Sequence, residues 1–507
     1  MEKGQICELR IEDMSSEGSG IGRCDGFVVF VPGTVPGDVV KAELTKVKKR
    51  YAFGSPVEIV EASPDRITEE EPCPYSDRCG GCPYIEIRYD AQLAIKEKQV
   101  REKLERMGEV SFCEGSGDES AGARFNPIIP AEGIYGYRNK AAMPISTGGL
   151  MTAKGGIQHP VHEPRIGFRP AKSHEVTDCT TCLLQTDAAM AAAEATRRFM
   201  EEDHICSYDK RWDKGLFHGM TVRTAFGTGE VMVVYDINGK GIPNAAKLIE
   251  YLDEAIYEAG LYDAGDSYFS LESVVIRNGK KTETLAGKST ITDIVEVGGR
   301  QLQFEISADS FYQVNHAQMQ NLYSLVRGYC EQVAQEGTAA DAGGVCDTEC
   351  SGACGTGRRP VILDLYCGIG TIGLCVADIA EHVHGIEIVK QATLDANRNA
   401  TINGIVNATY RCGKAEEILG DEEAVKELHP DIAILDPPRA GCKENLLTAI
   451  AGAGIRNIIY VSCDPATLAR DIKLLRGHGY ELVEATPVDL FPNTLHVECV
   501  VLMSKKA

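Results

Sequence analysis

The sequence predicts an α/β protein in which a doubly wound parallel sheet follows a small β-barrel and an α/β middle domain. A chain of 507 residues is too long for one hydrophobic core, so two or three domains are expected. Short strands at close spacing fill residues 1–62, and strand, glycine turn, helix and strand alternate from Val361 onward. We therefore expect a barrel at 1–62, a middle domain at 63–305 and the doubly wound domain at 306–507.

The composition places the chain among soluble globular proteins. Hydrophobic residues make up 43% and charged residues 25%, and no apolar stretch approaches the roughly 20 residues that cross a bilayer. The polar opening MEKGQICELRIED does not resemble a signal peptide, so we expect a cytoplasmic protein that binds no membrane. In that compartment the 19 cysteines favour metal binding, catalysis or packing over disulfides.

The N-terminal strands are joined by glycine and proline turns, as in a small β-barrel. They include ICELRIEDM, the glycine-rich SSEGSGIGRCDG, FVVFV and VVKAELTKV, and the stretch 41-KAELTKVKKR-50 carries five cations against one acid. This order resembles a TRAM domain, an RNA-binding barrel, which implies that the basic stretch tracks a phosphate backbone. Taken alone, the cations are as well explained by a solvated face that keeps edge strands apart.

The formal charge is −22, from 52 cations and 74 acids. This charge argues against broad attraction to nucleic acid, but it leaves room for local basic surfaces. A second loose basic group comprises Arg138, Lys140, Arg165, Arg169 and Lys172. A solvated surface explains this group as well as RNA contact does.

A cluster of cysteines opens the middle domain. The stretch 73-CPYSDRCGGC-82 contains Cys73, Cys79 and Cys82, and its glycines and prolines force turns that bring three thiolates to one point. A tetrahedral zinc or a [4Fe-4S] cluster needs a fourth ligand, for which Cys179 and Cys182 are the candidates. One triplet with a distant fourth cysteine favours iron-sulfur, and zinc stays the alternative.

Two helices and one linker complete the organisation before the last domain. The helix predicted at 90–108 has an imperfect apolar stripe of Leu93, Ile95, Val100, Leu104 and Met107, and a second helix is predicted at 187–202. Residues 335–360 are rich in glycine and are interpreted as an inserted linker. Its cysteines, Cys346, Cys350 and Cys354, are interpreted as incidental or at most an adventitious metal clip.

The glycine turn that opens the last domain indicates a nucleotide-type ligand. In 361-VILDLYCGIGTIG-373, Gly368, Gly370 and Gly373 satisfy G-x-G-x-x-G, and Glu387 ends the following strand. This pattern fits a dinucleotide, with pyrophosphate at the helix N-terminus and the acid on a ribose. Asp364, however, would lie close to a pyrophosphate, whereas it suits the cationic, phosphate-free S-adenosylmethionine.

A later strand ends in 436-DPPR-439, at a position where methyltransferases hold the reacting base or the cofactor. A methyltransferase is therefore the leading hypothesis, and an NAD-dependent oxidoreductase is the alternative. Arg439 stands where an aromatic residue would suggest attack by the exocyclic amine of adenine, so that this type of nucleophile is disfavoured.

Cys463 lies in 460-YVSCDP-465, between a predicted strand and an Asp-Pro turn, where α/β proteins bind their ligands. A cysteine in this place is either a packed small hydrophobe or a nucleophile. Carbon-5 of uracil becomes nucleophilic only after a thiolate has added at carbon-6. Cys463 is the candidate for that thiolate.

Together these motifs resemble the RNA uridine-C5 methyltransferases that carry an iron-sulfur cluster, most of all the branch that acts on 23S ribosomal RNA. The resemblance extends from the TRAM-like start through CPYSDRCGGC, CLLQ, SFYQVN, DLYCGIGTIG, GIEI, DPPR and YVSCDP to FPNTLHVE. It implies a Rossmann-like class I methyltransferase domain, S-adenosylmethionine as methyl donor, and a monomer that methylates uridine in RNA. Transfer RNA is the alternative substrate, and a non-catalytic iron-sulfur RNA-binding protein is the alternative of another class.

The resemblance also implies roles for individual residues. Cys463 would be the nucleophile and Glu498 the base that removes the carbon-5 proton. The residues that would contact S-adenosylmethionine are Gln313, Tyr366, Thr371, Glu387 and Asp436. The residues that would hold a [4Fe-4S] cluster are Cys73, Cys79, Cys82 and Cys182, which leaves Cys179 as a spare thiol.

Two positions depart from the family pattern. Asn493 stands where histidine is frequent, and Lys414 stands where an acid is common, which weakens an adenine contact there. The apolar neighbours of Glu498 predict a partly buried strand that would raise its pKa towards that of a useful base, although a surface acid is the alternative. Packing is expected for Cys367, Cys375, Cys412, Cys442 and Cys499.

Overall fold

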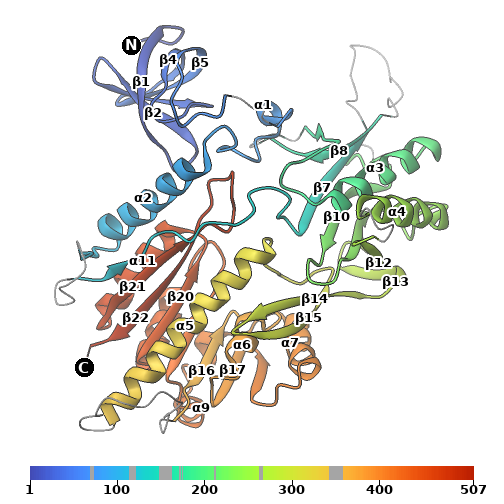
Figure 1. Cartoon of the computed structure of the whole chain (residues 1–507). Coiled ribbons are helices and arrows are strands. Elements are labelled where there is room, and N and C mark those ends of the chain that lie inside the picture. The colour runs from blue at the N-terminus through green and yellow to red at the C-terminus, as the bar shows by residue number, and fades with distance from the viewer. Residues whose placement is uncertain are drawn as a thin grey trace.

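The computed structural model describes residues 1–68, 73–113, 122–147, 163–170, 173, 175–210, 213–261, 267–341 and 358–506. It contains a closed barrel, a seven-stranded sheet, a two-stranded hairpin and an eight-stranded sheet (Figure 1). Within these ranges, no helix combines the length and the apolar character that a bilayer crossing requires. The linker cysteines Cys346, Cys350 and Cys354 lie outside the described residues.

The predicted N-terminal barrel is present and closes in the order β1-β2-β3-β5-β4. Side chains that point inward alternate with outward ones along the first four strands and at the start of the fifth, and Leu9, Val29 and Leu44 are among those that fill the interior. Its strands are β1 (Ile6–Met14), β2 (Ser19–Cys24), β3 (Phe27–Pro32), β4 (Val39–Val47) and β5 (Tyr51–Glu61).

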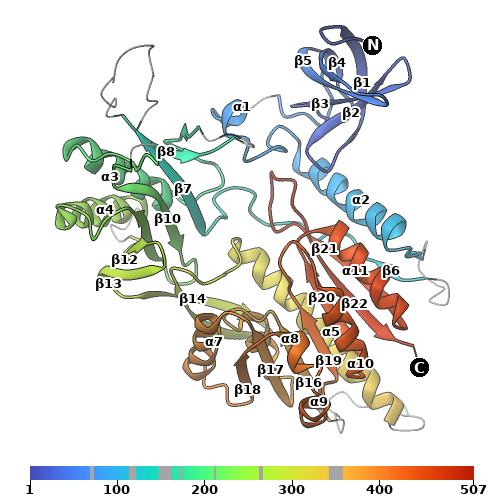
Figure 2. The same cartoon turned by 180° about the vertical axis from the view of Figure 1, so that it is seen from behind.

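The middle domain is a mixed sheet whose two long helices lie side by side on one face (Figures 1 and 2). The sheet order is β13-β12-β11-β10-β7-β8-β9, and Phe199 and Leu252 of the helices pack against Tyr235 of the sheet in one core. The strands are β7 (Lys140–Thr147), β8 (Pro164–Phe168), β9 (Thr177–Asp178), β10 (Phe217–Thr224), β11 (Glu230–Ile237), β12 (Ser270–Asn278) and β13 (Lys281–Gly287). The helices are α3 (Asp187–Glu202), which confirms the helix predicted at 187–202, and α4 (Ala245–Ala259).

The last domain is the doubly wound sheet that the strand and helix alternation predicted. Its order is β18-β17-β16-β19-β20-β22-β21-β6, with β16 to β20 parallel and β22 antiparallel to both of its neighbours. The strands are β6 (Arg124–Phe125), β16 (Val361–Leu365), β17 (His382–Glu387), β18 (Ala408–Cys412), β19 (Ile432–Leu435), β20 (Asn457–Ser462), β21 (Tyr480–Val488) and β22 (Glu498–Lys505). The short strand β6 thus extends this sheet, although its sequence lies within the 63–305 range.

Helices cover both faces of this sheet (Figure 2). One face packs against α5 (His316–Asp341), α6 (Thr371–Val376) and α7 (Lys390–Ile402). The other face packs against α2 (Tyr89–Met107), α8 (Ala415–Ile418), α9 (Glu422–Leu428), α10 (Glu444–Gly452) and α11 (Pro465–Gly477). Residues 335–341 continue α5, so the predicted start of the linker at 335 is wrong.

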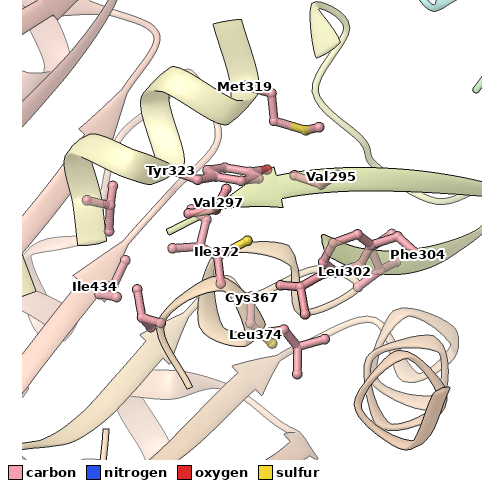
Figure 3. Packing of buried hydrophobic residues seen from close by; sticks show 14 of the residues in the cluster. Val295, Val297, Leu302, Phe304, Met319, Tyr323, Cys367, Ile372, Leu374 and Ile434 are labelled. Carbon is pink, nitrogen blue, oxygen red and sulfur yellow. The ribbon is translucent and has the colours of Figure 1, made fainter. Parts of the chain in front are cut away.

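A hairpin joins the middle domain to the last one. It consists of β14 (Thr290–Val297) and β15 (Arg300–Ser307). Val295 and Phe304 of the hairpin belong to the same buried cluster as Tyr323 of α5 and Leu374 of α6, as Figure 3 shows. This shared core fixes the segment after the hairpin, which carries Gln313, against the large sheet.

The helix α2 confirms the helix predicted at 90–108, but its buried face differs from the predicted stripe. Its buried residues are Gln92, Lys96, Val100 and Leu104. Met107, which the stripe included, is exposed. Two polar side chains therefore occupy the buried part of this helix, and their partners, Asn493 and Asp489, lie in the loop that precedes Glu498.

Candidate functional site

The fold brings Cys463 and Glu498 to the same end of two neighbouring strands. Antiparallel pairing of β20 with β22 places Ser462 opposite Cys499. Cys463 follows β20 directly, and Glu498 is the first residue of β22. The two candidate catalytic residues, 35 positions apart in the sequence, therefore flank one register pair.

A helix cap shapes the turn that carries Cys463. Asp464 is the N-cap of α11 and accepts hydrogen bonds from the backbone N–H of Ala466 at 2.8 Å and of Thr467 at 3.0 Å. Pro465 follows at the first helical position, where its missing N–H has no consequence. The Asp-Pro pair thus begins the helix and leaves Cys463 half-buried at the strand end.

The charges around Cys463 act against one another. Burial, followed by the nearby carboxylate of Glu498, raises the pKa of the Cys463 thiol to about 11, and the guanidinium of Arg439 opposes this shift. Glu498 is only 3% exposed. Burial and then Asp436 raise its pKa well above the ordinary glutamate value, while Arg439 again acts in the opposite direction. The Cys463 thiol, the carboxyl groups of Glu498 and Asp436 and the guanidinium of Arg439 therefore influence one another's pKa. Cys463 lies among these polar groups and is not enclosed by hydrocarbon.

His496 lies beside Arg439, and the sequence motifs predicted no role for it. The two side chains approach to 3.3 Å between Arg439 Nη2 and His496 Nε2. Burial, together with the positive charge of Arg439, lowers the pKa of His496 to about 4. The imidazole is therefore neutral at pH 7 and can accept a hydrogen bond from the guanidinium. The position of His496 in the FPNTLHVE motif, two residues before Glu498, is the sequence feature that could have predicted a role for it.

Four of the five residues expected to contact S-adenosylmethionine lie at or after the carboxyl ends of the central parallel strands. Tyr366 follows β16, Glu387 ends β17 and Asp436 follows β19. Thr371 is the first residue of α6 and accepts a hydrogen bond from Tyr323 at 3.0 Å. Gln313 is buried in the segment between β15 and α5. This edge is where open α/β sheets bind ligands.

The glycine turn is fixed by close contacts. Glu387 accepts hydrogen bonds from the backbone N–H of Gly368 at 3.2 Å and of Val389 at 2.8 Å. Gly370 has φ +83°, and a Cβ there would lie 2.8 Å from the ring of Tyr410, so only glycine fits. The turn holds Glu387 at the strand end, next to the start of α6.

Asp364 lies under the glycine turn and is buried. Its Oδ2 accepts a hydrogen bond from the N–H of Gly373 at 3.0 Å, and its Oδ1 has no partner among the described residues. Burial raises the pKa of Asp364 to about 7, and Asp436 and Glu387 contribute to the rise. Burial likewise raises the pKa of Asp436 to about 7. Three carboxyl groups in one place suit a cationic ligand and oppose a pyrophosphate.

A buried polar network holds residues 489–497, the loop that precedes Glu498. Gln92 Nε2 donates to Asn493 Oδ1, and the backbone N–H of Asn493 donates to Gln92 Oε1, both at 2.9 Å. Lys96 Nζ donates to Asp489 Oδ1 at 2.6 Å and to the carbonyl of Phe491 at 2.9 Å. The spacing of residues 92, 96, 100 and 104 could have predicted this buried face of α2. The predicted apolar stripe missed part of it because Gln92 and Lys96 are polar.

The backbone conformation at position 493 suits an asparagine. Asn493 has φ +64° and is buried. Asparagine adopts this left-handed conformation more readily than most residues. Its Nδ2 also donates to the carbonyl of Ile134 at 2.9 Å. Hydrogen bonds of Asn493 therefore connect the loop to α2 and to the segment before β7.

The five cysteines of the predicted cluster surround one small cavity of about 30 Å³. The cavity lining includes Cys73, Cys79, Cys82, Cys179 and Cys182. The hydroxyl of Tyr75 links the two cysteine segments, because it lies 2.9 Å from Thr180 Oγ1 and accepts a hydrogen bond from the Thr180 N–H at 3.1 Å. The helix α1 (Ser76–Cys79) ends at Gly80, whose φ of +66° turns the chain back towards the cavity.

The thiols differ in pKa, and no three of them, all among the described residues, are arranged to hold a metal ion. A hydrogen bond from Cys179 lowers the pKa of Cys79 to about 6, whereas burial raises that of Cys82 to about 12 and also raises that of Cys182. In the part of the chain that the structure describes, no three His, Cys, Asp or Glu side chains are arranged to hold a metal ion. The thiol donors fit a soft metal centre in chemistry, but their side chains would have to turn towards one point.

The remaining sequence expectations have mixed outcomes. The packing role is confirmed for the buried Cys367, Cys375, Cys442 and Cys499, and it is wrong for Cys412, which is exposed. Lys414 forms an ion pair with Glu417, 2.6 Å between Nζ and Oε1, at the start of α8.

Comparison with known proteins gives matches along the whole chain. A family model described as tRNA (Uracil-5-)-methyltransferase matches residues 352–506, and a TRAM domain model matches residues 1–57. The solved structure of the Pyrococcus abyssi tRNA (uracil-54, C5)-methyltransferase in complex with S-adenosyl-L-homocysteine matches with a TM-score of 0.67 at 25% identity, covering 98% of this chain and 99% of that chain.

Two full-length relatives decide the family. An uncharacterized RNA methyltransferase of Halalkalibacterium halodurans is 34% identical over 508 residues, covering 100% of this chain and 98% of the relative. Another, from Clostridium acetobutylicum, is 35% identical over 506 residues with the same coverage. The chain therefore belongs to the RNA methyltransferase family of these relatives, with a TRAM domain at its start and a uracil-5-methyltransferase domain at its end.

Proposed function

We propose that this enzyme transfers a methyl group from S-adenosylmethionine to carbon-5 of a uridine in 23S ribosomal RNA, through a covalent bond between Cys463 and carbon-6. The observation that carries the proposal is the register of β20 and β22, which brings Cys463 and Glu498 to one strand end. A thiol beside a buried carboxyl group is the pair that this chemistry needs, because one group adds to the ring and the other removes a proton.

The proposed reaction balances as an addition, a methylation and an elimination. The Cys463 thiolate adds to carbon-6 of the flipped-out uracil, and the electrons of the 5,6 double bond move towards the carbon-4 carbonyl as an enolate. Carbon-5 uses the enolate electrons to take the methyl group of S-adenosylmethionine, whose methyl–sulfur bond breaks with its electrons on sulfur, so that S-adenosylhomocysteine leaves. Glu498 accepts the carbon-5 proton, the electrons of that bond restore the double bond, and the Cys463 sulfur leaves with the electrons of its bond to carbon-6.

Arg439 is the group that favours the reactive protonation states. Burial raises the pKa of both Cys463 and Glu498, which favours the thiol and the neutral carboxylic acid. The guanidinium of Arg439 acts in the opposite direction at both residues, because a nearby cation stabilises thiolate and carboxylate. We assign Arg439 the role of activating the pair electrostatically.

For the methyl donor we propose contacts from Gln313, Tyr366, Thr371, Glu387 and Asp436. The residues present fit such a ligand, since Asp436 and the unpartnered Asp364 Oδ1 make this end of the sheet acidic. Glu387 is held by the glycine turn at the place where ribose hydroxyls are bound in this class of fold. A positively charged, phosphate-free donor matches these charges better than a dinucleotide does.

For the cysteine cavity we propose a [4Fe-4S] cluster held by Cys73, Cys79, Cys82 and Cys182. A bound cluster would supply a covalent cross-link between the two cysteine segments. The donor set supports iron-sulfur, because the cavity is lined by thiols and apolar side chains such as Ile85, Phe168 and Leu183. Cys179, which hydrogen-bonds to Cys79, would remain a free thiol.

Transfer RNA is the second candidate substrate. The observation that favours it is the match over 98% of this chain to a structure named for a tRNA uracil-54 methyltransferase. The test is to incubate the enzyme and S-adenosylmethionine with 23S ribosomal RNA and with tRNA from cells lacking the gene. The proposal predicts 5-methyluridine, detected by mass spectrometry of nucleosides, in the ribosomal RNA. Methylation of tRNA alone would favour the second candidate, and no 5-methyluridine in either RNA would contradict both.

A further inference from the structure

The middle sheet has an open groove on the face opposite α3 and α4. Its volume is about 710 Å³, and its lining includes Pro144, Arg169, His218, Asp236 and Arg277. Successive side chains along β7 and β10 point to opposite faces of the sheet. Met143 and Met220 point to the helices, while the residues before and after them point to the groove side.

Positive charge is in excess along this face. Lys140 pairs in register with Arg223, so two cations lie opposite each other on neighbouring strands. Burial lowers the pKa of Lys140, and Arg223 and Arg277 lower it further. Arg277 forms an ion pair with Asp236 at 2.5 Å and another with Asp309. Among the described residues, neither Lys140 nor the exposed Arg169 has an acidic partner within ion-pair distance, so both are available to an anionic ligand.

An aromatic surface adjoins these cations. His218 is exposed and lines the groove. Its ring lies against that of Tyr208, with the centroids 4.2 Å apart. Aromatic rings beside a cationic track are the combination that single-stranded nucleic acids recognise, because bases stack on the rings and phosphates meet the cations.

The groove side of the sheet continues into the segment that carries Gln313. Arg223 donates hydrogen bonds to the carbonyls of Ala308 at 3.2 Å and of Ser310 at 2.5 Å. Asn139 Nδ2, next to Lys140, donates to the carbonyl of Gln313 at 2.8 Å. Phe311, in the same segment, is 66% exposed. The groove side of the sheet is therefore joined by hydrogen bonds to the segment that carries Gln313, a residue expected to contact the methyl donor.

We propose that this groove, together with Lys140 on the same sheet face beside its lining, binds the single-stranded nucleotides that flank the target uridine, with Lys140 and Arg169 on phosphates and His218 under a base. The inference rests on the proposed function for its choice of RNA as ligand. Charge complementarity supports it, because unpaired cations gather here in a chain whose net charge is −22. Lys140 and Arg169 belong to the basic group noted in the sequence, and both are assigned to phosphate contacts on this face. Lys172 of the same group lies outside the described residues.

The test measures the binding of a fluorescein-labelled 20-nucleotide single-stranded RNA by fluorescence anisotropy at several salt concentrations. The double variant Lys140→Gln/Arg169→Gln is expected to bind at least about fivefold more weakly, with a salt slope smaller by about 0.7 for each phosphate that the variant no longer neutralises. The matched control is Arg198→Gln on α3, on the helix-covered side, where the side chain is paired with Glu202. The control is expected to keep both the affinity and the slope of the wild type.

A second pair of variants tests stacking without removing a cation. His218→Ala is expected to weaken RNA binding at least about fivefold, and His218→Phe to restore it, because any aromatic ring offers a stacking face. Affinity and salt slope equal to the wild type in all groove variants would overturn the proposal. So would an equal loss of affinity for a fully paired RNA duplex, or a loss of binding to poly-L-glutamate with unchanged RNA affinity.

Failure of the proposed function gives a different result. An enzyme that produces no 5-methyluridine but whose RNA affinity depends on Lys140, Arg169 and His218 would contradict the assigned reaction and support the groove. An enzyme that methylates uridine while the groove variants bind RNA like the wild type would support the reaction and overturn the groove.

Discussion

Lys96 Nζ lies 2.6 Å from Asp489 Oδ1, and neither side chain is exposed. This ion pair joins α2, which follows the cysteine cavity, to the loop that leads into Glu498. Burial lowers the pKa of Lys96 although Asp489 opposes the shift. The pair therefore fixes the loop geometry at the expense of burying two charges.

Replacement of Lys96 by methionine is expected to lower the free energy of unfolding by about 3–5 kcal/mol, because the carboxylate of Asp489 would stay buried without its partner. The double variant Lys96→Met/Asp489→Leu is expected to recover most of this loss, since no charge remains buried. Urea unfolding monitored by circular dichroism measures both changes.

Lys98 on the same helix provides the control. It pairs with Asp13 at 2.7 Å, but both side chains are about half exposed. Lys98→Met is expected to change the free energy of unfolding by less than about 1 kcal/mol. Equal effects of the Lys96 and Lys98 substitutions would show that the buried pair does not hold the loop.

The reactivity of Cys463 is expected to follow the charges around it. Alkylation by iodoacetamide requires the thiolate, so the rate at Cys463 should rise with pH up to about pH 11. Arg439→Met should move this profile to higher pH, because the cation that stabilises the thiolate is gone. Glu498→Gln should move it to lower pH, because the nearby carboxylate is removed. Mass spectrometry of the peptide that contains Cys463 measures the rate separately from the other cysteines.

Shifts of the alkylation profile in the same direction for Arg439→Met and Glu498→Gln would contradict this electrostatic explanation. Asp436→Asn provides a further check, since Asp436 also raises the pKa of Cys463. Its profile should move to lower pH, as that of Glu498→Gln does.

The barrel is expected to lose stability in acid through Asp38. Burial alone would raise the pKa of Asp38, but hydrogen bonds from Arg66 and from the N–H groups of Val35 and Ser63 outweigh it, and the net shift is downward. A carboxyl group with a lowered folded-state pKa stabilises the fold above its ordinary pKa of 3.8 and loses this contribution as the pH falls through the lower value.

Asp38→Asn is therefore expected to lower the urea midpoint of the barrel at pH 7 and to differ much less from the wild type near pH 3. Pulsed hydrogen exchange of peptides from residues 1–62 measures the barrel separately from the other domains. A difference that stays constant between pH 7 and pH 3 would exclude Asp38 as the source of the acid sensitivity.

The cysteine cavity gives a metal-specific prediction. Protein purified without oxygen is expected to contain four irons and four acid-labile sulfides, as a [4Fe-4S] cluster requires. Cys182→Ser should lose most of this iron, whereas Cys179→Ser, three residues away, should keep it. Stoichiometric zinc in place of iron would contradict the iron-sulfur proposal, and equal loss in both variants would contradict the assignment of Cys182.

The sequence predicted those features that follow from local rules. Alternating strands and glycine turns predicted the doubly wound sheet, and the Asp-Pro turn after Cys463 proved to be the N-cap of α11. The order of the motifs predicted that Cys463 and Glu498 act together. Only the antiparallel register of β20 and β22 shows that they lie at the same strand end. Register between distant strands depends on tertiary packing, which no short sequence window contains.

Other features escaped prediction because polar residues were assumed to face solvent. Gln92 and Lys96 are buried because their partners, Asn493 and Asp489, come from a segment about 400 positions away. Residues 335–341 were assigned to a linker from their composition, yet they extend α5, since a helix that is already formed adds residues at little cost. Cys412 was assigned to packing, but β18 is an edge strand and leaves it exposed.

The covalent mechanism is tested most directly by the fate of the bond between Cys463 and carbon-6 when Glu498 cannot remove a proton. Glu498→Gln is incubated with uridine-containing RNA and S-adenosylmethionine, denatured, and analysed by gel electrophoresis and mass spectrometry. The covalent mechanism predicts a stable complex in which a methylated uracil is bonded to Cys463, and no complex in the variant that also carries Cys463→Ala. Normal release of 5-methyluridine by Glu498→Gln, or a complete absence of the bond while the variant still binds RNA, would contradict it.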